Sequence, residues 1–283
     1  MRVNKRESIL IFVFFVLLVV TYLVFNNSQS DYLKVSFLNI GQGDSILFQT
    51  PTGGKILIDG GRDDTVLTRL GTELPILTKN IDLVIATHDD SDHIAGLISV
   101  LKKYNVKVLL YSLSNSENPI SKELIKLANE KNVKVVQITK PMIIKSEDGL
   151  VIKILFPAQN MDGAVNGNDA SVVAQFIYGQ DKFLLTGDLP QAGEIFLVHK
   201  YGESLKSNIL KLGHHGSDTS TNPTFLQMVS PELAIVSAGK NNSFGHPHKS
   251  VLDLLEKFGI KVLRTDEEGT INLYSNGVNI WKG

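Results

Sequence analysis

The chain has 283 residues, and its 28 Lys and Arg residues nearly balance 29 Asp and Glu residues, giving a formal net charge of −1. This balance argues against binding of nucleic acid through overall charge, although it does not exclude a local basic patch on the surface. Hydrophobic residues make up 43% of the chain, which excludes wholesale disorder, and the absence of cysteine excludes disulfides, thiolate nucleophiles and Cys-ligated zinc.

An uninterrupted apolar run occupies residues 9–25 and lies at the short end of the range for a membrane-spanning helix. Basic side chains in residues 1–8 precede the run, and the polar linker 26–31 that follows has no positive charge. By the positive-inside rule, residues 1–8 are expected in the cytoplasm, with residues 32–283 as a domain outside. The prediction is a single-pass protein of the cell membrane.

Two other interpretations of the run stay open. A cleaved signal peptide would make the protein secreted, but the run is long for a signal-peptide core, and Phe25-Asn26-Asn27 lacks the small-residue cleavage pattern. A buried core helix is the other alternative, and no amphipathic pattern supports it. The uncleaved anchor is therefore favoured.

Beyond the linker, the sequence alternates between strand and helix patterns. Residues 33–38, 45–49 and 55–59 are expected to form a strand meander joined by Gly-rich turns. Further strands are expected at 81–87, 106–111, 133–138, 151–156, 171–178, 182–186, 207–212, 233–237, 261–264, 270–274 and 278–281. Helices are expected at 93–104, 121–131 with Ser121 as N-cap, 192–201, 223–229 and 248–258. Two sheets packed face to face, with helices outside, would accommodate this order.

Potential metal ligands gather directly after the expected strand 81–87. His88, Asp90, Asp92 and His93 follow one another in a loop that leads into a helix. Such a loop can aim alternate side chains at one point, and imidazole together with carboxylate suits zinc, manganese or iron. A solvated acidic loop with a helix cap would explain the carboxylates but not both flanking histidines.

The pattern His88-x-Asp90-x-Asp92-His93 resembles the H-x-H-x-D-H motif of the metallo-β-lactamase fold, with Asp90 in place of the second His. This variant resembles the outward-facing hydrolase-like domain of ComEC-type competence proteins. Five more segments resemble that family in the same order: F-L-N-I-G-Q-G-D at 37–44, I-D-G-G at 58–61, T-G-D at 186–188, K-L-G-H-H-G-S at 211–217, and the Ser-to-Pro segment 237–247.

The resemblance covers roughly residues 33–282 and implies an α/β protein with the four-layer αββα metallo-β-lactamase fold: two packed mixed β-sheets with outer helices. The N-terminal transmembrane helix would precede this fold. A full competence protein of this type carries a many-helix channel, whereas this chain has one hydrophobic segment. The expectation is therefore a stand-alone hydrolase domain, and a role as a DNA-uptake channel is not carried over.

Two divalent metal ions, Zn²⁺ or Mn²⁺, are implied by the resemblance. The expected ligands are His88 and Asp90 for the first ion, Asp92, His93 and His246 for the second, and Asp188 as the carboxylate that bridges them.

The resemblance places a further His about twenty positions before the bridging Asp, where this chain has Asn168 and Asp169. One of them is expected to ligate through oxygen or to hold a water. At Asp90, too, a carboxylate oxygen stands where the motif has an imidazole nitrogen. The metal preference of the site is therefore expected to move from zinc toward manganese.

Other polar residues in the matching segments are candidates for catalysis. His214 and His215 could each donate a proton to the leaving group, or one could complete a metal shell, because adjacent side chains of an extended chain point in different directions. Asp92 is expected to take part in catalysis besides binding metal.

Three more residues are candidates to hold a phosphate or carboxylate: Lys211, Ser217 and Asn242. Lys211 is also a candidate for the catalytic machinery, and for the other two ordinary surface polarity is an equal alternative. Asp59 is expected to accept a hydrogen bond that orients the loop at His88.

The leading hypothesis is a membrane-anchored, metal-dependent hydrolase that uses a metal-bound hydroxide on phosphodiesters, with single- or double-stranded DNA as the first candidate substrate. Two alternatives stay open: a small-molecule hydrolase of the lactonase or β-lactamase type, and a non-catalytic binding module on the same fold. No obligate protein partner can be deduced.

Overall fold

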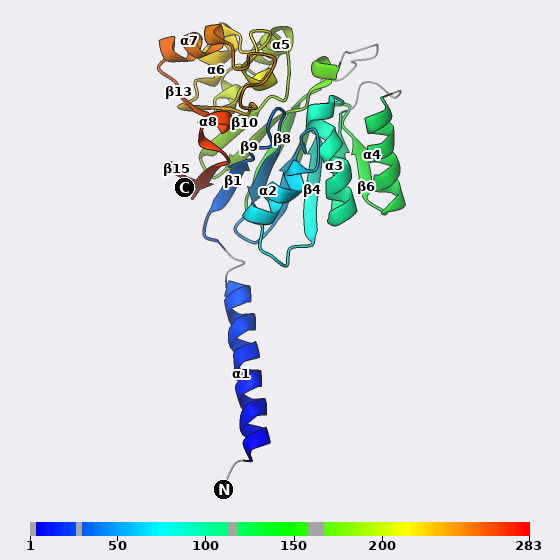
Figure 1. The fold of residues 1–283 in the computed structure, drawn as a ribbon. Helices are drawn as coiled ribbons and strands as arrows, with labels where there is room; N and C mark the ends of the chain where they lie inside the picture. Colours follow the sequence, from blue (N-terminus) through cyan, green and yellow to red (C-terminus); the bar gives the residue numbers. More distant parts are fainter. Residues whose placement is uncertain (1–3, 27–29, 113–117, 158–166) are drawn as a thin grey trace.

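The computed structural model describes residues 4–26, 30–112, 118–157 and 167–283. Its strands form two mixed sheets that pack face to face, and helices cover the outer face of each sheet (Figure 1). The predicted four-layer αββα arrangement is therefore confirmed.

The first sheet has eight strands in the order β15-β14-β1-β2-β3-β4-β5-β6. Antiparallel pairing runs from β15 to β3, and β3 to β6 pair in parallel. Its strands are β1 (Leu33–Phe37), β2 (Ile46–Gln49), β3 (Lys55–Ile58), β4 (Asn80–Ala86), β5 (Asn105–Tyr111), β6 (Lys134–Gln137), β14 (Ile271–Ser275) and β15 (Ile280–Lys282).

The second sheet has seven strands in the order β13-β12-β11-β10-β9-β8-β7. Strands β10 to β13 pair in parallel, and β7 to β10 pair antiparallel. Its strands are β7 (Met142–Lys145), β8 (Val151–Phe156), β9 (Val173–Tyr178), β10 (Asp181–Leu185), β11 (Ile209–Lys211), β12 (Leu233–Val236) and β13 (Lys261–Arg264).

Three hydrophobic clusters hold the four layers together. Residues on the inner faces of both sheets form the central cluster, where the rings of Phe48 and Phe176 stack with centroids 4.1 Å apart. The other two lie beneath the helices: α2 (Thr65–Glu73), α3 (Ser91–Lys103) and α4 (Pro119–Glu130) cover the first sheet, and α5 (Gln191–Tyr201), α6 (Pro223–Val229) and α7 (Lys249–Lys257) cover the second. The short helix α8 (Thr265–Glu268) follows β13.

The period-two alternation of strands explains how one sheet feeds two clusters. In β3, Ile56 and Ile58 belong to the central cluster, whereas Leu57 between them packs beneath the helices. Every strand and helix predicted in the domain is present with small shifts at its ends, while α2, α8 and β7 were not predicted. Strand β7 has only four residues, lies at the edge of the second sheet, and has alternate residues exposed.

The cap predicted for α4 is wrong. Asn118, not Ser121, is the N-cap residue, since its side chain accepts hydrogen bonds from the backbone N–H groups of Ile120 and Ser121. Pro119 at the first helical position fits this start, because its missing N–H would have no partner there.

The N-terminal helix α1 spans Lys5–Asn26, as expected for the apolar run. Its large apolar side chains from Ile9 to Val20 are 38–68% exposed. Within the described residues, none of the helices combines the length and the apolar character needed to cross a membrane.

The carboxyl ends of parallel strands lie at the same edge of a sheet. The loops that hold the predicted site residues follow these ends. Asp59 follows β3, and the loop beginning at His88 follows β4 in the first sheet. In the second sheet, Asp188 follows β10 and His214 follows β11. The loops from both sheets therefore meet at one rim of the molecule.

Candidate metal centre

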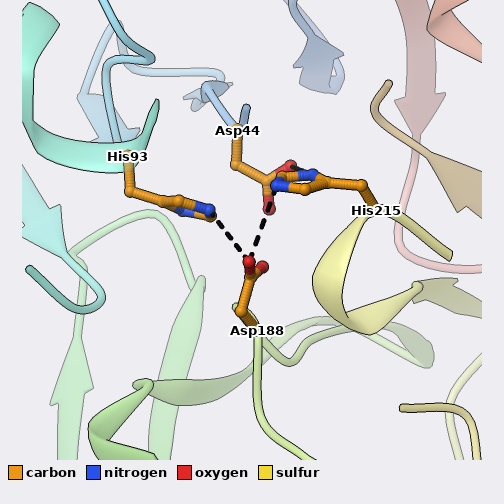
Figure 2. Close-up of side chains that lie close together, drawn as sticks. All are labelled: Asp44, His93, Asp188 and His215. Carbon is orange, nitrogen blue, oxygen red and sulfur yellow. Dashed lines mark ion pairs between the residues drawn. The ribbon is translucent and has the colours of Figure 1, made fainter. Parts of the chain in front are cut away.

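Four buried side chains from four separate segments of the chain converge at this rim. One ligand atom from each of Asp44, His93, Asp188 and His215 lies within 4.8 Å of the others. In Figure 2, the carboxylate of Asp188 points up between the other three side chains. Its Oδ2 lies 3.3 Å from Nε2 of His93 and 3.5 Å from Nε2 of His215.

Two further histidines approach the same carboxylate. Nε2 of His88 and Nε2 of His214 each lie 3.9 Å from Oδ2 of Asp188. Asp188 is therefore the common neighbour of four imidazole nitrogens. This is the position that a bridging ligand would occupy.

Asp59 fixes which ring nitrogen of two histidines faces inward. Its Oδ2 accepts a hydrogen bond from Nδ1 of His93 at 2.8 Å and another from the hydroxyl of Thr87 at 2.6 Å. With that hydroxyl donating to Asp59, its oxygen accepts from Nδ1 of His88, 2.9 Å away. Both Nε2 atoms thus present lone pairs to the centre, the arrangement that a carboxylate behind a metal-binding His produces.

The other two histidines are held in the same way. Nδ1 of His215 donates to the carbonyl of Ser237 at 3.0 Å, and Nδ1 of His214 lies 2.9 Å from Oγ1 of Thr219. That Thr hydroxyl donates to Oγ of Ser217, so its oxygen is left to accept from His214. In both cases Nε2 is free to face the centre.

Adjacent histidines can converge here because the backbone is not extended. His214 has φ +50° and His215 has φ +56°, in the left-handed region that non-glycine residues rarely adopt. The expectation that the two side chains must diverge is therefore wrong. Strained backbone of this kind persists where the surrounding structure enforces it, most often at functional sites.

The cluster leaves several buried polar atoms without a hydrogen-bond partner among the described residues. They are Oδ1 of Asp44, Oδ1 of Asp188, and Nε2 of His88, His93 and His215. Buried groups of this kind destabilise a fold unless something satisfies them. Bound divalent metal would satisfy such acceptor atoms, so the residues fit a metal site.

Opposite charges dominate the electrostatics of the cluster. Burial alone would lower the pKa of His215, but the carboxylates of Asp188, Asp44 and Asp92 outweigh it and raise that pKa to about 9. Burial would raise the pKa of Asp188, but His93 and His215 hold it well below its ordinary value. A metal ion must displace protons from these histidines, so its affinity should fall as pH falls.

Comparisons with known proteins indicate the family. Residues 38–148 match the family model of the metallo-beta-lactamase superfamily. The chain is 35% identical over 263 residues to ComE operon protein 3 of Bacillus subtilis (strain 168), across 87% of the chain and 33% of that protein. It is 32% identical over 238 residues to competence protein ComA of Neisseria gonorrhoeae, across 84% of the chain and 31% of that protein. The chain carries the metallo-β-lactamase fold of ComEC-type competence proteins.

A solved structure agrees on the fold. The metallo-beta-lactamase fold protein YhfI from Bacillus subtilis aligns over 90% of the chain and 100% of its own, with a TM-score of 0.55 and 16% identity. The metallo-β-lactamase domain and its cluster of Asp and His residues support a metal-dependent hydrolase. The chain spans about one third of the length of the curated competence relatives it matches.

Of the predicted ligands, His93 and Asp188 belong to the four-residue cluster, which also contains Asp44 and His215. His246 was expected beside Asp92 and His93, and its ring lies at the edge of the site, 5.5 Å from the ring of His214. His215 also lies beside Asp92, with Nε2 3.6 Å from Oδ2 of that residue. The left-handed backbone turns His215 inward. Nδ1 of His246 is also buried without a hydrogen-bond partner among the described residues, so its role as a ligand stays a prediction.

Asp90, another predicted ligand, lies beside His88. Its Oδ2 lies 3.7 Å from Nε2 of His88, and its carboxylate remains about half exposed. The segment with Asn168 and Asp169 forms a short 3₁₀ helix. It lies close to the loop of Asp90, because a Cβ on Gly167 would be only 3.0 Å from Oδ1 of Asp90. Asp169 is not part of the four-residue cluster.

The predicted role of Lys211 in holding a substrate is wrong. Its side chain is fully buried, and its Nζ donates to Oδ2 of Asp44 at 2.8 Å and to the carbonyl of Leu212 at 2.9 Å. Lys211 therefore fixes Asp44 from behind and does not face a substrate.

Two other predicted substrate contacts are used within their own loops. Ser217 is buried, and its Oγ accepts from the hydroxyl of Thr219. The amide of Asn242 donates to the carbonyls of Gly239 and His246, and its Oδ1 accepts from the N–H of His246. Both side chains shape the site without being available to a phosphate, so these predictions are wrong.

Asp44, Thr87 and Thr219 belong to the site but were not singled out from the sequence. A signal for Asp44 existed, because it ends the Gly41-Gln42-Gly43 turn. A Cβ on Gly43 would lie 2.1 Å from the carbonyl oxygen of Asp92, so only glycine permits this loop to approach the ligand loop.

Proposed function

We propose that the chain is a metal-dependent phosphodiesterase that cleaves DNA. The observation that carries the proposal is the set of buried, unpartnered nitrogen and oxygen atoms that converge around Asp188. Such a set supports binding of divalent metal, and two-metal sites are common in enzymes that cleave phosphodiesters. The competence proteins among the relatives favour DNA as the substrate.

Two ions would divide the ligands between them, with Asp188 shared. His88 and Asp90 would hold one, and Asp92, His93 and His215 the other, with Asp44 beside them. Bound there, divalent ions supply an activated water and neutralise the charge that develops on the phosphate.

His214 is the residue of this group best placed to move a proton. Its side chain is 28% exposed, whereas that of His215 is 2% exposed. Burial lowers the pKa of His214, so its Nε2 is neutral at pH 7 and can accept a proton from the attacking water. The same nitrogen then returns the proton to the leaving oxygen, while Thr219 holds Nδ1.

A substrate panel tests the proposal. The full chain is incubated with Mn²⁺, Zn²⁺ or EDTA and with labelled oligonucleotides, a p-nitrophenyl phosphodiester, a chromogenic β-lactam and a lactone. We expect cleavage of both phosphodiester substrates with metal and none with EDTA. Hydrolysis of the β-lactam or lactone alone would instead establish a small-molecule hydrolase. Absence of bound metal and of all activity would indicate a binding module.

Asp90 should set the choice of metal. A carboxylate where the fold usually has imidazole favours Mn²⁺ over Zn²⁺ as the activating ion, because oxygen is the harder ligand. Asp90→His should move the preference toward Zn²⁺, measured as the ratio of hydrolysis rates with the two ions. Asp90→Asn is the control, since it retains an oxygen ligand and should keep the Mn²⁺ preference. An unchanged order of metals in Asp90→His would contradict this assignment.

We also propose that α1 attaches the domain to the cell membrane, with the domain on the outer side. The exposed apolar side chains on all sides of the described helix favour this, as does the full apolar run 9–25. Protease added to intact cells should digest the domain, and Leu18→Asp should move protein from the membrane fraction to the soluble fraction. Val278→Asp, at an exposed apolar residue of the domain, should not. Protection of the domain until lysis would show that the orientation is wrong.

A further inference from the structure

An exposed aromatic ring stands next to the metal centre. Phe244 is 53% exposed, and its ring stacks on that of His246 with centroids 5.7 Å apart and planes 23° apart. The ring of His246 in turn lies 5.5 Å from that of His214, whose Nε2 is 3.9 Å from Asp188. A line of aromatic rings thus leads from the reaction centre to the surface.

The loop that carries Phe244 is held in one conformation. Oδ1 of Asn242 accepts from the backbone N–H groups of Phe244 and His246, and its amide donates to carbonyls at both ends of the loop. The N–H of Gly239 donates to Oε1 of Gln42, which ties the loop to the turn before Asp44. A large apolar ring is therefore presented to solvent on a rigid support, where it gains little from folding.

A polar groove of about 540 Å³ runs along the same loop. It is lined by Lys240, Asn241, Asn242, Gly245, His246, Pro247, Arg264, Asp266 and Glu267. Arg264 forms ion pairs with Asp266 and Glu267, whereas Lys240 is exposed. The groove therefore places the charge of Lys240 on the same loop as His246, where it could contact a phosphate.

We propose that Phe244 is a stacking platform for the base next to the cleaved phosphate, and that the enzyme takes single-stranded nucleic acid. The proposal rests on the function proposed above. Proteins hold single strands with exposed aromatic rings and positive charges that contact the phosphates, because every base has a face that can stack. Here the exposed Lys240 supplies the charge. Within a duplex those faces are covered by neighbouring bases, so the platform selects an unpaired strand.

Binding to a fluorescein-labelled thymidine 12-mer tests the platform without hydrolysis, because EDTA stops turnover. In fluorescence anisotropy, Phe244→Ala should raise Kd at least fivefold, within the range measured for one stacked base. Phe244→Trp should stay within twofold of the unmodified chain. The matched control is Phe258→Ala, because Phe258 is 39% exposed at the far end of α7. Phe258→Ala should leave Kd unchanged.

An abasic 12-mer separates stacking from a change in loop structure. The unmodified chain should bind it at least fivefold more weakly than the thymidine 12-mer, and Phe244→Ala should bind the two equally. Lys240→Ala should reduce the slope of log Kd against log salt by about 1, as expected for one lost phosphate contact.

The two proposals can fail separately. Equal binding of the thymidine 12-mer by Phe244→Ala and the unmodified chain, or a duplex bound more tightly than the single strand, would overturn the platform even if phosphodiesters are hydrolysed. Binding that depends on Phe244, in a chain that hydrolyses no phosphodiester, would support the platform and refute the proposed reaction.

Discussion

Asp188→Ala should remove most of the bound metal and lower the rate of DNA cleavage by roughly 10³-fold, the scale on which loss of charge stabilisation in the transition state is felt. Both effects are expected because Asp188 lies at the centre of the histidines. Its Oδ2 is 3.3–3.9 Å from Nε2 of His88, His93, His214 and His215. Without that carboxylate, neither proposed ion keeps a shared anionic ligand. Metal content by mass spectrometry and oligonucleotide cleavage measure the two effects.

Asp181→Asn provides the matched control for this prediction. Asp181 is another buried carboxylate at the opposite end of β10, where it accepts a hydrogen bond from the hydroxyl of Ser275. Its replacement should lower stability but leave the metal content of the folded protein intact. Full metal content in Asp188→Ala would show that Asp188 is not the bridging ligand.

The part of the site that could be predicted is local in sequence. His88, Asp90, Asp92 and His93 all follow one strand, so a single loop brings them together whatever the rest of the fold does. The layer order could be predicted from the order of strand and helix patterns along the chain and from the resemblance of its motifs to the metallo-β-lactamase fold.

What could not be predicted depends on distant contacts. Asp44 reaches the site through Lys211, 167 positions away in the sequence, and no local pattern of residues encodes that contact. The inward turn of His215 depends on left-handed backbone at two non-glycine residues, a conformation that sequence patterns do not favour.

Polar loop residues were the other source of error. Ser217 and Asn242 have the composition expected of a substrate-binding loop, but Ser, Thr, Asn and Asp side chains readily bond to their own backbone in turns. In Asn242 that bonding uses both ends of the amide. The residues that such loops expose, here Phe244 and Lys240, are then the better candidates for contact with a substrate.

The adjacent histidines should give opposite results when each is replaced by Ala. His215 is buried with its Nε2 in the cluster, so His215→Ala should lose metal and lose activity equally on every substrate. His214 is partly exposed at the edge of the cluster, so His214→Ala should keep its metal. Its rate of DNA cleavage should fall by about 10²–10⁴-fold, the usual contribution of proton transfer, because the sugar oxygen that leaves is a poor leaving group.

The leaving group distinguishes proton transfer from metal binding. A p-nitrophenolate leaves without a proton, so His214→Ala should lose little activity on a p-nitrophenyl phosphodiester. Thr219→Val should show a weaker version of the same dependence, because the hydroxyl that holds Nδ1 of His214 is lost while the imidazole remains. His199→Ala, at an exposed histidine of α5, should change neither rate nor metal content. A proton donor matters most where the leaving oxygen is most basic. If His214→Ala keeps its metal but loses activity equally on DNA and on the p-nitrophenyl phosphodiester, His214 positions the substrate and does not transfer the proton.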